Sequence, residues 1–151
     1  MASFDGLGDI LADALAEAIA TVTGINLEHM PDCSQNFFGE IIGAMVLSSK
    51  KSGILFISAN EKDIRVLCSN MIGASEDEIT CGDTEDTLCE FVNMTAGSAK
   101  LRLSDPDYRF VLSSPFIIRG GGIEVSTKSR TQVISKTLGN GEINIRIKFI
   151  C

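Results

Sequence analysis

The chain has 151 residues, of which 44% are hydrophobic and 22% are charged. This length and composition fit one globular domain over residues 1–151 and exclude a disordered chain. The 13 Lys and Arg against 20 Asp and Glu give a net charge of -7, which would repel the phosphate backbone of a nucleic acid and argues against such a partner.

Residues 3–22 predict an amphipathic helix, because apolar residues recur at helical spacing while Asp9, Asp13 and Glu17 lie on the other side. These carboxylates, with no basic region before them, argue against a signal peptide and a membrane span. Five cysteines without a CxxC pair are expected to stay reduced. We therefore expect a cytoplasmic protein with no membrane contact.

Residues 24–36 predict an irregular connection that carries the single histidine, His29, for which the sequence identifies no metal or acid-base partner. Two apolar runs at 40–48 and 53–59, joined by polar turn residues, predict a β-hairpin. Asn60 then predicts the N-cap of a second helix that ends at Gly73.

A third helix is predicted over residues 84–101, with Asp83 or Thr84 as its cap, and Asp105-Pro106-Asp107 predicts the turn that follows it. The rest of the chain predicts strands at 109–113, 115–118, 122–126, 131–137 and 142–150. Gly120-Gly121-Gly122 predicts a β-turn or bulge, since it lacks the helix start and the Lys of a phosphate loop. Gly139-Asn140-Gly141 predicts a hairpin.

The last strand predicts one core face and one solvated face. Its apolar residues Ile143, Ile145, Ile147 and Phe149 alternate with Asn144, Arg146 and Lys148. The order α-β-β-α-α, followed by several antiparallel strands, predicts a single α+β domain, with helices packed on one face of a mostly antiparallel sheet.

The third helix has two different faces. At about 100° per residue, its buried side is predicted to contain Leu88, Phe91, Val92, Thr95 and Ala99. The opposite side carries Asp86, Glu90, Asn93 and Gly97 within a narrow band. Because Asn and Gly are poor helix formers, this side is either an ordinary solvated face or a surface kept for a function.

Chemically, Glu90 and Asn93 offer a carboxylate beside an amide that both donates and accepts hydrogen bonds. The pair lacks a base-activated nucleophile and the His or Cys ligands of a zinc site. Asp86 and Glu90 could hold a divalent ion through water, although no second carboxylate cluster supports this. An amide that aligns an attacking water is a known part of phosphoryl-transfer sites.

The pattern Asp86-x-x-x-Glu90-x-x-Asn93-x-x-x-Gly97, followed by a Pro115-containing β segment and the triple glycine, resembles the signature of the CheC/CheX chemotaxis phosphatases. The order of the elements is also similar, so the resemblance covers most of the chain. Two-site members repeat ExxN on the first helix, but here that stretch reads Glu17-Ala18-Ile19-Ala20. The resemblance is therefore to the CheX branch, with one site per chain.

The resemblance implies hydrolysis of the aspartyl phosphate on a CheY-like response-regulator receiver domain. Asn93 would position the attacking water and Glu90 would pair with the receiver's lysine, while Asp86 and Gly97 would shape the contact. No cofactor would be bound by this chain, because the Mg²⁺ would be held by the receiver. A homodimer formed through the sheet is also implied.

Two other hypotheses stay open at the level of the sequence. The same face could bind a receiver without hydrolysing anything, or the domain could be a dimerising scaffold in two-component signalling. The sequence does not identify the receiver.

Overall fold

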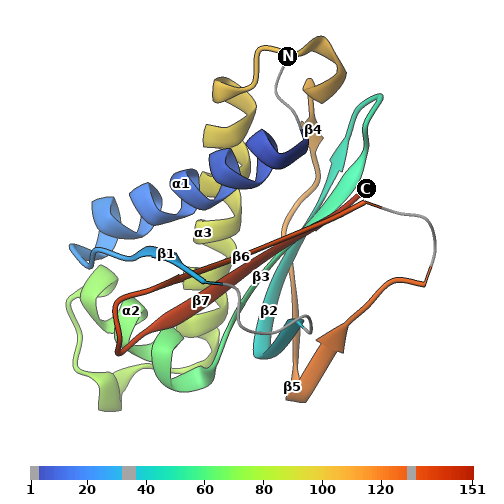
Figure 1. Cartoon of the computed structure of the whole chain (residues 1–151). Helices are drawn as coiled ribbons and strands as arrows, with labels where there is room; N and C mark the ends of the chain where they lie inside the picture. Colours follow the sequence, from blue (N-terminus) through green and yellow to red (C-terminus); the bar gives the residue numbers. More distant parts are fainter. Residues whose placement is uncertain (1–3, 32–36, 129–131) are drawn as a thin grey trace.

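Three helices cover one face of a seven-stranded antiparallel sheet in the computed structural model, which describes residues 4–31, 37–128 and 132–151 (Figure 1). The helices are α1 (Phe4–Thr23), α2 (Glu61–Ile72) and α3 (Cys81–Arg102). The strands are β1 (Glu28–Met30), β2 (Phe37–Ser48), β3 (Gly53–Ala59), β4 (Val111–Leu112), β5 (Phe116–Val125), β6 (Val133–Gly139) and β7 (Asn144–Ile150). Short 3-10 turns lie at Glu76–Glu78 and Pro106–Tyr108. The predicted α+β class is confirmed.

The sheet has the strand order β1-β6-β7-β3-β2-β4, and β5 also pairs with β2. β2 therefore holds β3 along one edge and both β4 and β5 along the other. The predicted hairpin between β2 and β3 is confirmed, as is the one between β6 and β7, where Gly139 pairs with Asn144 and Gly141 has a φ of +90°.

Several predicted boundaries were wrong. The connection 24–36 contains β1, which pairs with β6, and its residues 32–36 lie outside the described part. β2 begins at Phe37 rather than at residue 40. The strands predicted at 109–113 and 131–137 are shorter or shifted, since β4 spans Val111–Leu112 and β6 starts at Val133 after the undescribed residue 131.

The strands predicted at 115–118 and 122–126 form one strand, β5, because the triple glycine is a bulge rather than a chain reversal. Arg119 pairs with Ile41 and Ile123 with Gly39, so the three glycines lie opposite the single residue Glu40. Gly122 has a φ of +69°, a backbone conformation that favours glycine. Of the two alternatives predicted for this segment, the bulge is confirmed.

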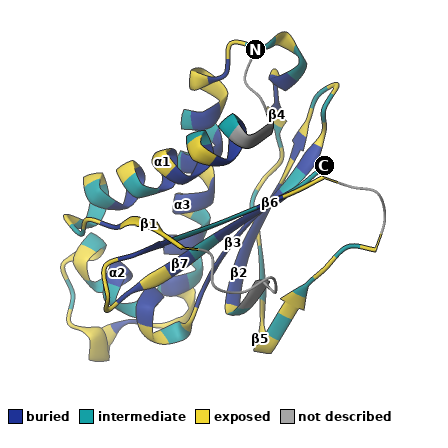
Figure 2. Ribbon diagram, in the orientation of Figure 1, coloured by how far each residue is buried: buried dark blue, intermediate teal, exposed yellow. Residues whose placement is uncertain are grey.

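The main core lies between the helices and the sheet, as the buried residues in Figure 2 show. Leu7, Leu11, Leu15 and Ile19 of α1 are fully buried, whereas Asp9, Asp13 and Glu17 are exposed. The amphipathic pattern of α1 is thus confirmed. No helix within the described residues is long and apolar enough to cross a membrane.

The opposite face of the sheet carries a smaller apolar cluster. Ile42, Ala44 and Phe56 pack there against Ile123 and Val125 of β5 and other partly buried residues. Lys148, predicted to face water, is only 5% exposed, and its Nζ donates to the Val125 carbonyl at 2.6 Å. The prediction was wrong because alternation along one strand does not show that another strand, β5, lies against that face.

Candidate functional site on the third helix

α3 begins three residues earlier than predicted. Thr80 is its N-cap: the Thr80 hydroxyl accepts from the Asp83 N–H at 3.1 Å, and the Asp83 carboxylate accepts from the Thr80 N–H at 2.9 Å. This capping box satisfies two N–H groups that the helix itself leaves unpaired. Asp83 is therefore the third residue of the helix, and the prediction of Asp83 or Thr84 as the cap was wrong. The hydrogen bond that the Asp83 carboxylate accepts from the Thr80 N–H, with a smaller contribution from the Thr80 hydroxyl, lowers the pKa of Asp83.

The middle of α3 packs closely on β2. A Cβ at Gly43 would lie 2.8 Å from the Val92 side chain and 3.0 Å from Leu88, so only glycine lets the helix approach this near. Leu88, Phe91, Val92, Thr95 and Ala99 are all buried, as predicted. This contact fixes which side of α3 faces the sheet and which side faces outward.

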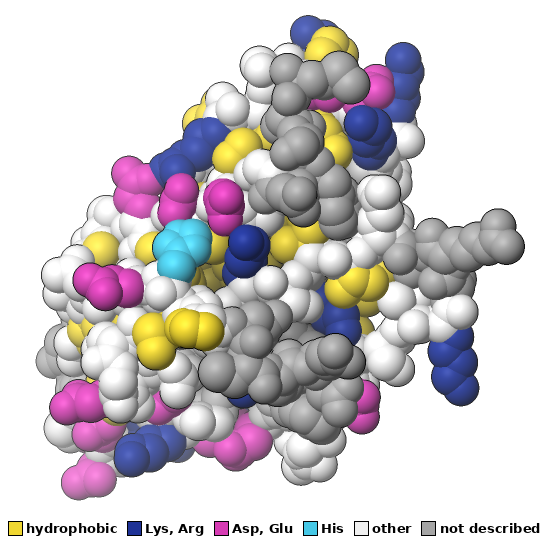
Figure 3. Space-filling model, viewed as in Figure 1, with side chains coloured by type: hydrophobic (Ala, Val, Ile, Leu, Met, Phe, Trp, Pro, Cys, Tyr) yellow, Lys and Arg dark blue, Asp and Glu magenta, His cyan; other side chains and the backbone are white. Residues whose placement is uncertain are grey.

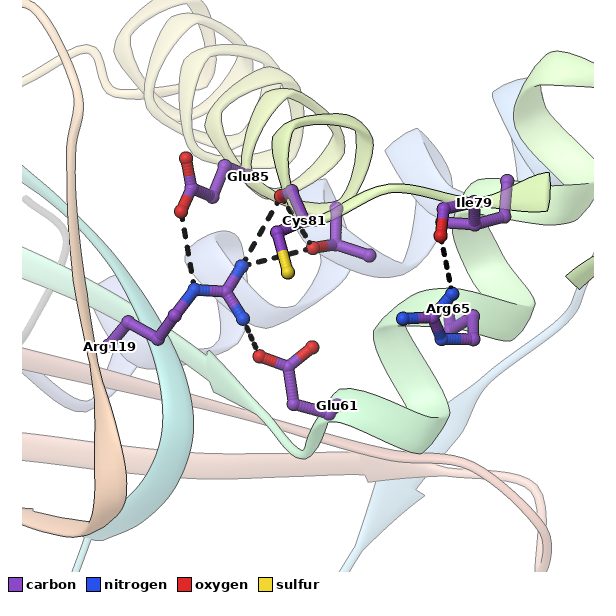
Figure 4. Close-up of polar contacts among 7 residues, drawn as sticks. Glu61, Arg65, Ile79, Cys81, Glu85 and Arg119 are labelled. Carbon is purple, nitrogen blue, oxygen red and sulfur yellow. Dashed lines mark hydrogen bonds and ion pairs between the residues drawn. The ribbon is translucent and has the colours of Figure 1, made fainter. Parts of the chain in front are cut away.

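The first turn of α3 is also bound to β5 and α2 through Arg119 (Figure 4). The Arg119 guanidinium forms an ion pair with Glu61 of α2 and donates to Glu85 at 3.2 Å. It also donates to the Cys81 carbonyl at 3.3 Å and to the Thr84 hydroxyl at 3.1 Å. Two carboxylates and two neutral oxygens thus surround one cation at the junction of three elements.

Arg65 of α2 holds the connection that leads into α3. Its Nη1 donates to the Ile79 carbonyl at 2.6 Å (Figure 4). It also donates to the Glu76 carbonyl at 3.1 Å. Because Ile79 immediately precedes the Thr80 cap, this contact sets where the helix can start. Together, Arg65 and Arg119 attach the N-terminal end of α3 to the rest of the fold.

Asp86, Glu90, Asn93 and Gly97, hereafter the polar stripe, lie on the outward side of α3. Asp86, Glu90 and Asn93 are exposed and Gly97 is half-buried. At about 100° per residue the four positions fall within a band of about 60°, opposite the buried side. Within the described residues, the side chains of Asp86, Glu90 and Asn93 form no hydrogen bond or ion pair. The predicted outward orientation of the stripe is confirmed.

Gly97 is not required by packing within the chain. A Cβ built there meets no atom within 4 Å, and its φ is not in the left-handed region. Glycine in mid-helix costs about 1 kcal/mol relative to alanine. Neither crowding nor backbone conformation therefore explains this residue, whereas a partner that comes close to the helix backbone would.

Cys89 lies next to the polar stripe on α3, and the pKa of its thiol is raised. Burial raises the pKa of its thiol, and the negative charges of Asp86 and Glu85 raise it further. Since the thiolate is the reactive form of cysteine, these surroundings suppress Cys89 as a nucleophile. The polar stripe is left with an amide and carboxylates, groups that orient water and bind cations.

The described residues contain no cluster of three or more His, Cys, Asp or Glu that could hold a metal ion. His29 Nε2 lies 2.7 Å from Asp13 Oδ1 of α1, and the histidine, cyan in Figure 3, lies among acidic side chains. A pocket of about 270 Å³ lies beside the β5 bulge, lined by Glu40, Asn60 and Arg146 among others. None of the polar-stripe residues lines it, and we do not assign the function to it.

The first helix presents a counterpart of the ExxN pattern that lacks its amide. Ala20 stands where an Asn would be needed, and the Glu17 carboxylate forms an ion pair with Arg102 of α3. Both side chains line a groove of about 200 Å³ between α1 and α3. The Glu17 carboxylate is thus already paired with a guanidinium, whereas the Glu90 carboxylate has no ion-pair partner within the described residues.

The sequence did not predict Thr80, Arg65 or Arg119 as residues that position α3. Thr80-x-x-Asp83 is a recognisable capping-box pattern, so that signal was available. Arg65 and Arg119 carry no local signal, because their partners lie between 11 and 58 residues away along the chain.

A family model described as "Chemotaxis phosphatase CheX" matches residues 41–138 of the chain. This range includes the whole polar stripe, Gly43 and Arg119. Among curated proteins, no match is found.

Several solved structures share the fold. A CheC-like superfamily protein from Shewanella superposes with a TM-score of 0.84 at 23% identity, covering 98% of this chain and 97% of its own. Chemotaxis protein CheX from Vibrio vulnificus gives a TM-score of 0.83 at 19% identity, covering 95% of each chain. A Borrelia burgdorferi CheX-CheY-BeF3-Mg²⁺ complex gives 0.75 at 14% identity, covering 99% of this chain and 98% of that one.

Proposed function

The chain belongs to the CheX family of chemotaxis phosphatases, and on that premise we propose that it hydrolyses the aspartyl phosphate of a CheY-like receiver domain. The observation that carries the proposal is the pair Glu90 and Asn93. Their side chains are exposed and have no partner within the described residues. They lie on the side of α3 that faces outward because the other side packs on Gly43 and the first turn is held by Arg119. The pair is thus available to an incoming protein.

Asn93 would act on the attacking water. Its amide oxygen accepts a hydrogen bond from the water, which fixes the oxygen in line with the phosphorus. The water oxygen then bonds to phosphorus while the bond between phosphorus and the aspartyl oxygen breaks. The aspartate leaves as a carboxylate with the bonding electron pair, and the water's protons end on inorganic phosphate and solvent.

Glu90 would recognise the receiver by charge. Its carboxylate would pair with the lysine of the receiver's active site, and Asp86 and Gly97 would contact the surrounding surface. The net charge of -7 favours a partner that offers cations at the contact. Because no suitable ligand cluster was found in the described part of the chain, we propose that the receiver supplies the Mg²⁺, and no step here uses a metal bound by this chain.

The complex of the Borrelia burgdorferi relative contains CheX together with CheY, BeF3 and Mg²⁺. That composition supports a receiver of the CheY type as the partner. One active face per chain is part of the same proposal, since α1 lacks the amide. The cytoplasm as the site of action and a homodimer formed through the sheet remain predictions from the family resemblance.

The test is the lifetime of the phosphate on a purified CheY-like receiver from the same organism, phosphorylated with acetyl phosphate. The wild type should shorten this lifetime. Asn93→Ala should lower the catalysed rate of dephosphorylation by at least about a hundredfold, as expected for loss of a water-positioning group. Asn70→Ala, the same change at an exposed position of α2, is the control and should stay as active as wild type.

Two results would contradict the proposal. If Asn93→Ala keeps wild-type activity with its fold intact, Asn93 does not position the water. If the wild type binds the phosphorylated receiver without shortening its lifetime, the domain is a non-catalytic receiver-binding module. Loss of dimerisation, and nothing else, on changing Glu90 or Asn93 would favour the scaffold hypothesis.

A further inference from the structure

The polar stripe continues into an apolar residue, Leu101. Leu101 lies four residues after Gly97, and its helical angle differs from that of Gly97 by about 40°. It is 88% exposed, more than any other large hydrophobic residue recorded as exposed in the described chain. Single exposed apolar residues are common on protein surfaces, so exposure alone assigns nothing. Its position at the end of the polar stripe makes it informative.

The space over Gly97 separates Asn93 from Leu101. With a rise of about 1.5 Å per residue, each lies about 6 Å from Gly97 along the helix axis, on opposite sides. A Cβ at Gly97 would meet nothing within 4 Å, so neither side chain fills this space. Glycine therefore leaves an opening beside Leu101 that another protein's side chain can enter.

The groove between α1 and α3 lies on the other flank of Leu101. It is lined by Ala14 and Ala18 of α1 and by Met94 and Ser98 of α3, among others, and its volume is about 200 Å³. Met94 and Ser98 lie seven and three residues before Leu101, so they share its side of the helix. A protruding leucine next to a shallow, partly apolar groove offers a shape that a folded partner can match.

We propose that Leu101 is an apolar anchor for the phosphorylated receiver and that the docking surface extends from the polar stripe over Gly97 to Leu101 and the α1–α3 groove. This proposal rests on the proposed function. The argument for the receiver as occupant is the size of its contact. A protein interface covers about 800 Å² on each partner, a patch with a radius of roughly 16 Å. Leu101 lies about 14 Å along the axis from the midpoint of Glu90 and Asn93, so a receiver centred on this pair would still cover it.

The chemistry of the stripe also calls for such an anchor. Asp86, Glu90 and Asn93 offer charged and polar contacts, which steer and orient a partner but add little net affinity at an exposed site. Burial of an exposed leucine side chain in a contact removes apolar surface from water, and so adds binding free energy that these polar contacts do not supply. Within the polar stripe and its continuation, Leu101 is the large apolar side chain.

Leu101→Gln tests the proposal, since glutamine is a good helix former and the position is exposed, so the fold should be kept. Dephosphorylation is followed over a range of concentrations of the receiver phosphorylated with acetyl phosphate. The KM should rise on the order of tenfold or more, as for loss of a buried leucine contact, while the turnover at saturating receiver stays within about twofold. Val111→Gln, at a 70% exposed position of β4, is the matched control and should leave KM unchanged.

The outcomes separate this inference from the proposed function. An unchanged KM in Leu101→Gln, while Asn93→Ala is inactive, overturns the anchor and keeps the phosphatase. If the wild type is inactive, the affinity for the phosphorylated receiver is compared by calorimetry, and a loss in Leu101→Gln but not in Val111→Gln still supports the anchor. A change of oligomeric state in Leu101→Gln with unchanged affinity for the receiver would show that Leu101 serves contacts between copies of this chain, which overturns the proposal.

Discussion

Replacing Gly97 with alanine should make the protein more stable and less active. The substitution adds one methyl group to the outward side of α3 at a helical position where a Cβ meets no atom within 4 Å. The change therefore introduces no clash within the chain. It removes the conformational freedom that glycine gives the unfolded chain, which favours the folded state.

The expected gain in the free energy of unfolding is about 1 kcal/mol, the difference between glycine and alanine in a helix interior. For a domain of 151 residues this corresponds to a rise in Tm of roughly 2–4 °C. Activity should change in the opposite direction. The methyl lies about one turn from Asn93, and a displacement of the receiver by about 1 Å can lower the rate about a hundredfold, so we expect kcat/KM to fall by about ten- to a hundredfold.

Urea denaturation and the lifetime of the receiver phosphate measure the two effects separately. Gly97→Gln provides a size series, because it should remain more stable than wild type but lose more activity than Gly97→Ala. A stabilised Gly97→Ala with unchanged kcat/KM would show that no partner approaches this part of the helix. A destabilised variant would show that Gly97 has a role inside the fold that its open surroundings do not reveal.

Thr80→Ala should lower the free energy of unfolding by about 1 kcal/mol because it removes the N-cap of α3, while Thr80→Ser should keep most of it. Asp83 stabilises the fold fully above its ordinary pKa of 3.8 and loses this contribution as the pH falls through its lowered folded pKa. Asp83→Asn should therefore make acid denaturation less steep below pH 3.8, and an unchanged pH profile would contradict the role of the capping box. Asp86→Asn should lower the pKa of the Cys89 thiol and speed its alkylation by iodoacetamide at pH 8, about one unit below the ordinary thiol pKa of 9.0, because it removes a negative charge that raises that pKa. An unchanged alkylation rate would show that Asp86 does not act on this thiol.

Periodicity predicted the elements whose surroundings repeat along the chain. The buried side of α3, the outward polar stripe and the amphipathic α1 all follow from spacing of 3.6 residues, because one side of each helix packs on one continuous core. Local turn chemistry similarly predicted Asn60 and Gly73 as the ends of α2. These features depend on neighbours within a few residues.

The features that were missed depend on contacts between distant segments. Lys148 is buried because β5 lies against its side of the sheet, and no pattern within β7 contains that information. Arg119 holds α3 through partners 34 to 38 residues away, and three glycines form a bulge in its strand. The residues of the polar stripe were thus predictable from the sequence, whereas several of the contacts that position α3 were not.

The α1 counterpart of the site differs from the polar stripe in two ways: its carboxylate, Glu17, is already paired, and Ala20 replaces the amide. The missing amide is the more important of the two. Glu17 is paired with Arg102, but both side chains are at least one-third exposed, and such a pair contributes about 0–1 kcal/mol. A receiver lysine could displace Arg102 at a cost of at most about fivefold in affinity. The missing amide at Ala20 has no such remedy, because an alanine side chain cannot accept a hydrogen bond from the attacking water.

Removing the ion pair between Glu17 and Arg102 should therefore not by itself produce phosphatase activity at α1. In the inactive Asn93→Ala background, Arg102→Gln is expected to stay inactive in the phosphate-lifetime assay. Any activity that Ala20→Asn regains in this background should rise by no more than about fivefold when Arg102→Gln is added. Activity in Asn93→Ala with Arg102→Gln alone would show that the ion pair, and not the absent amide, limits this chain to one active face.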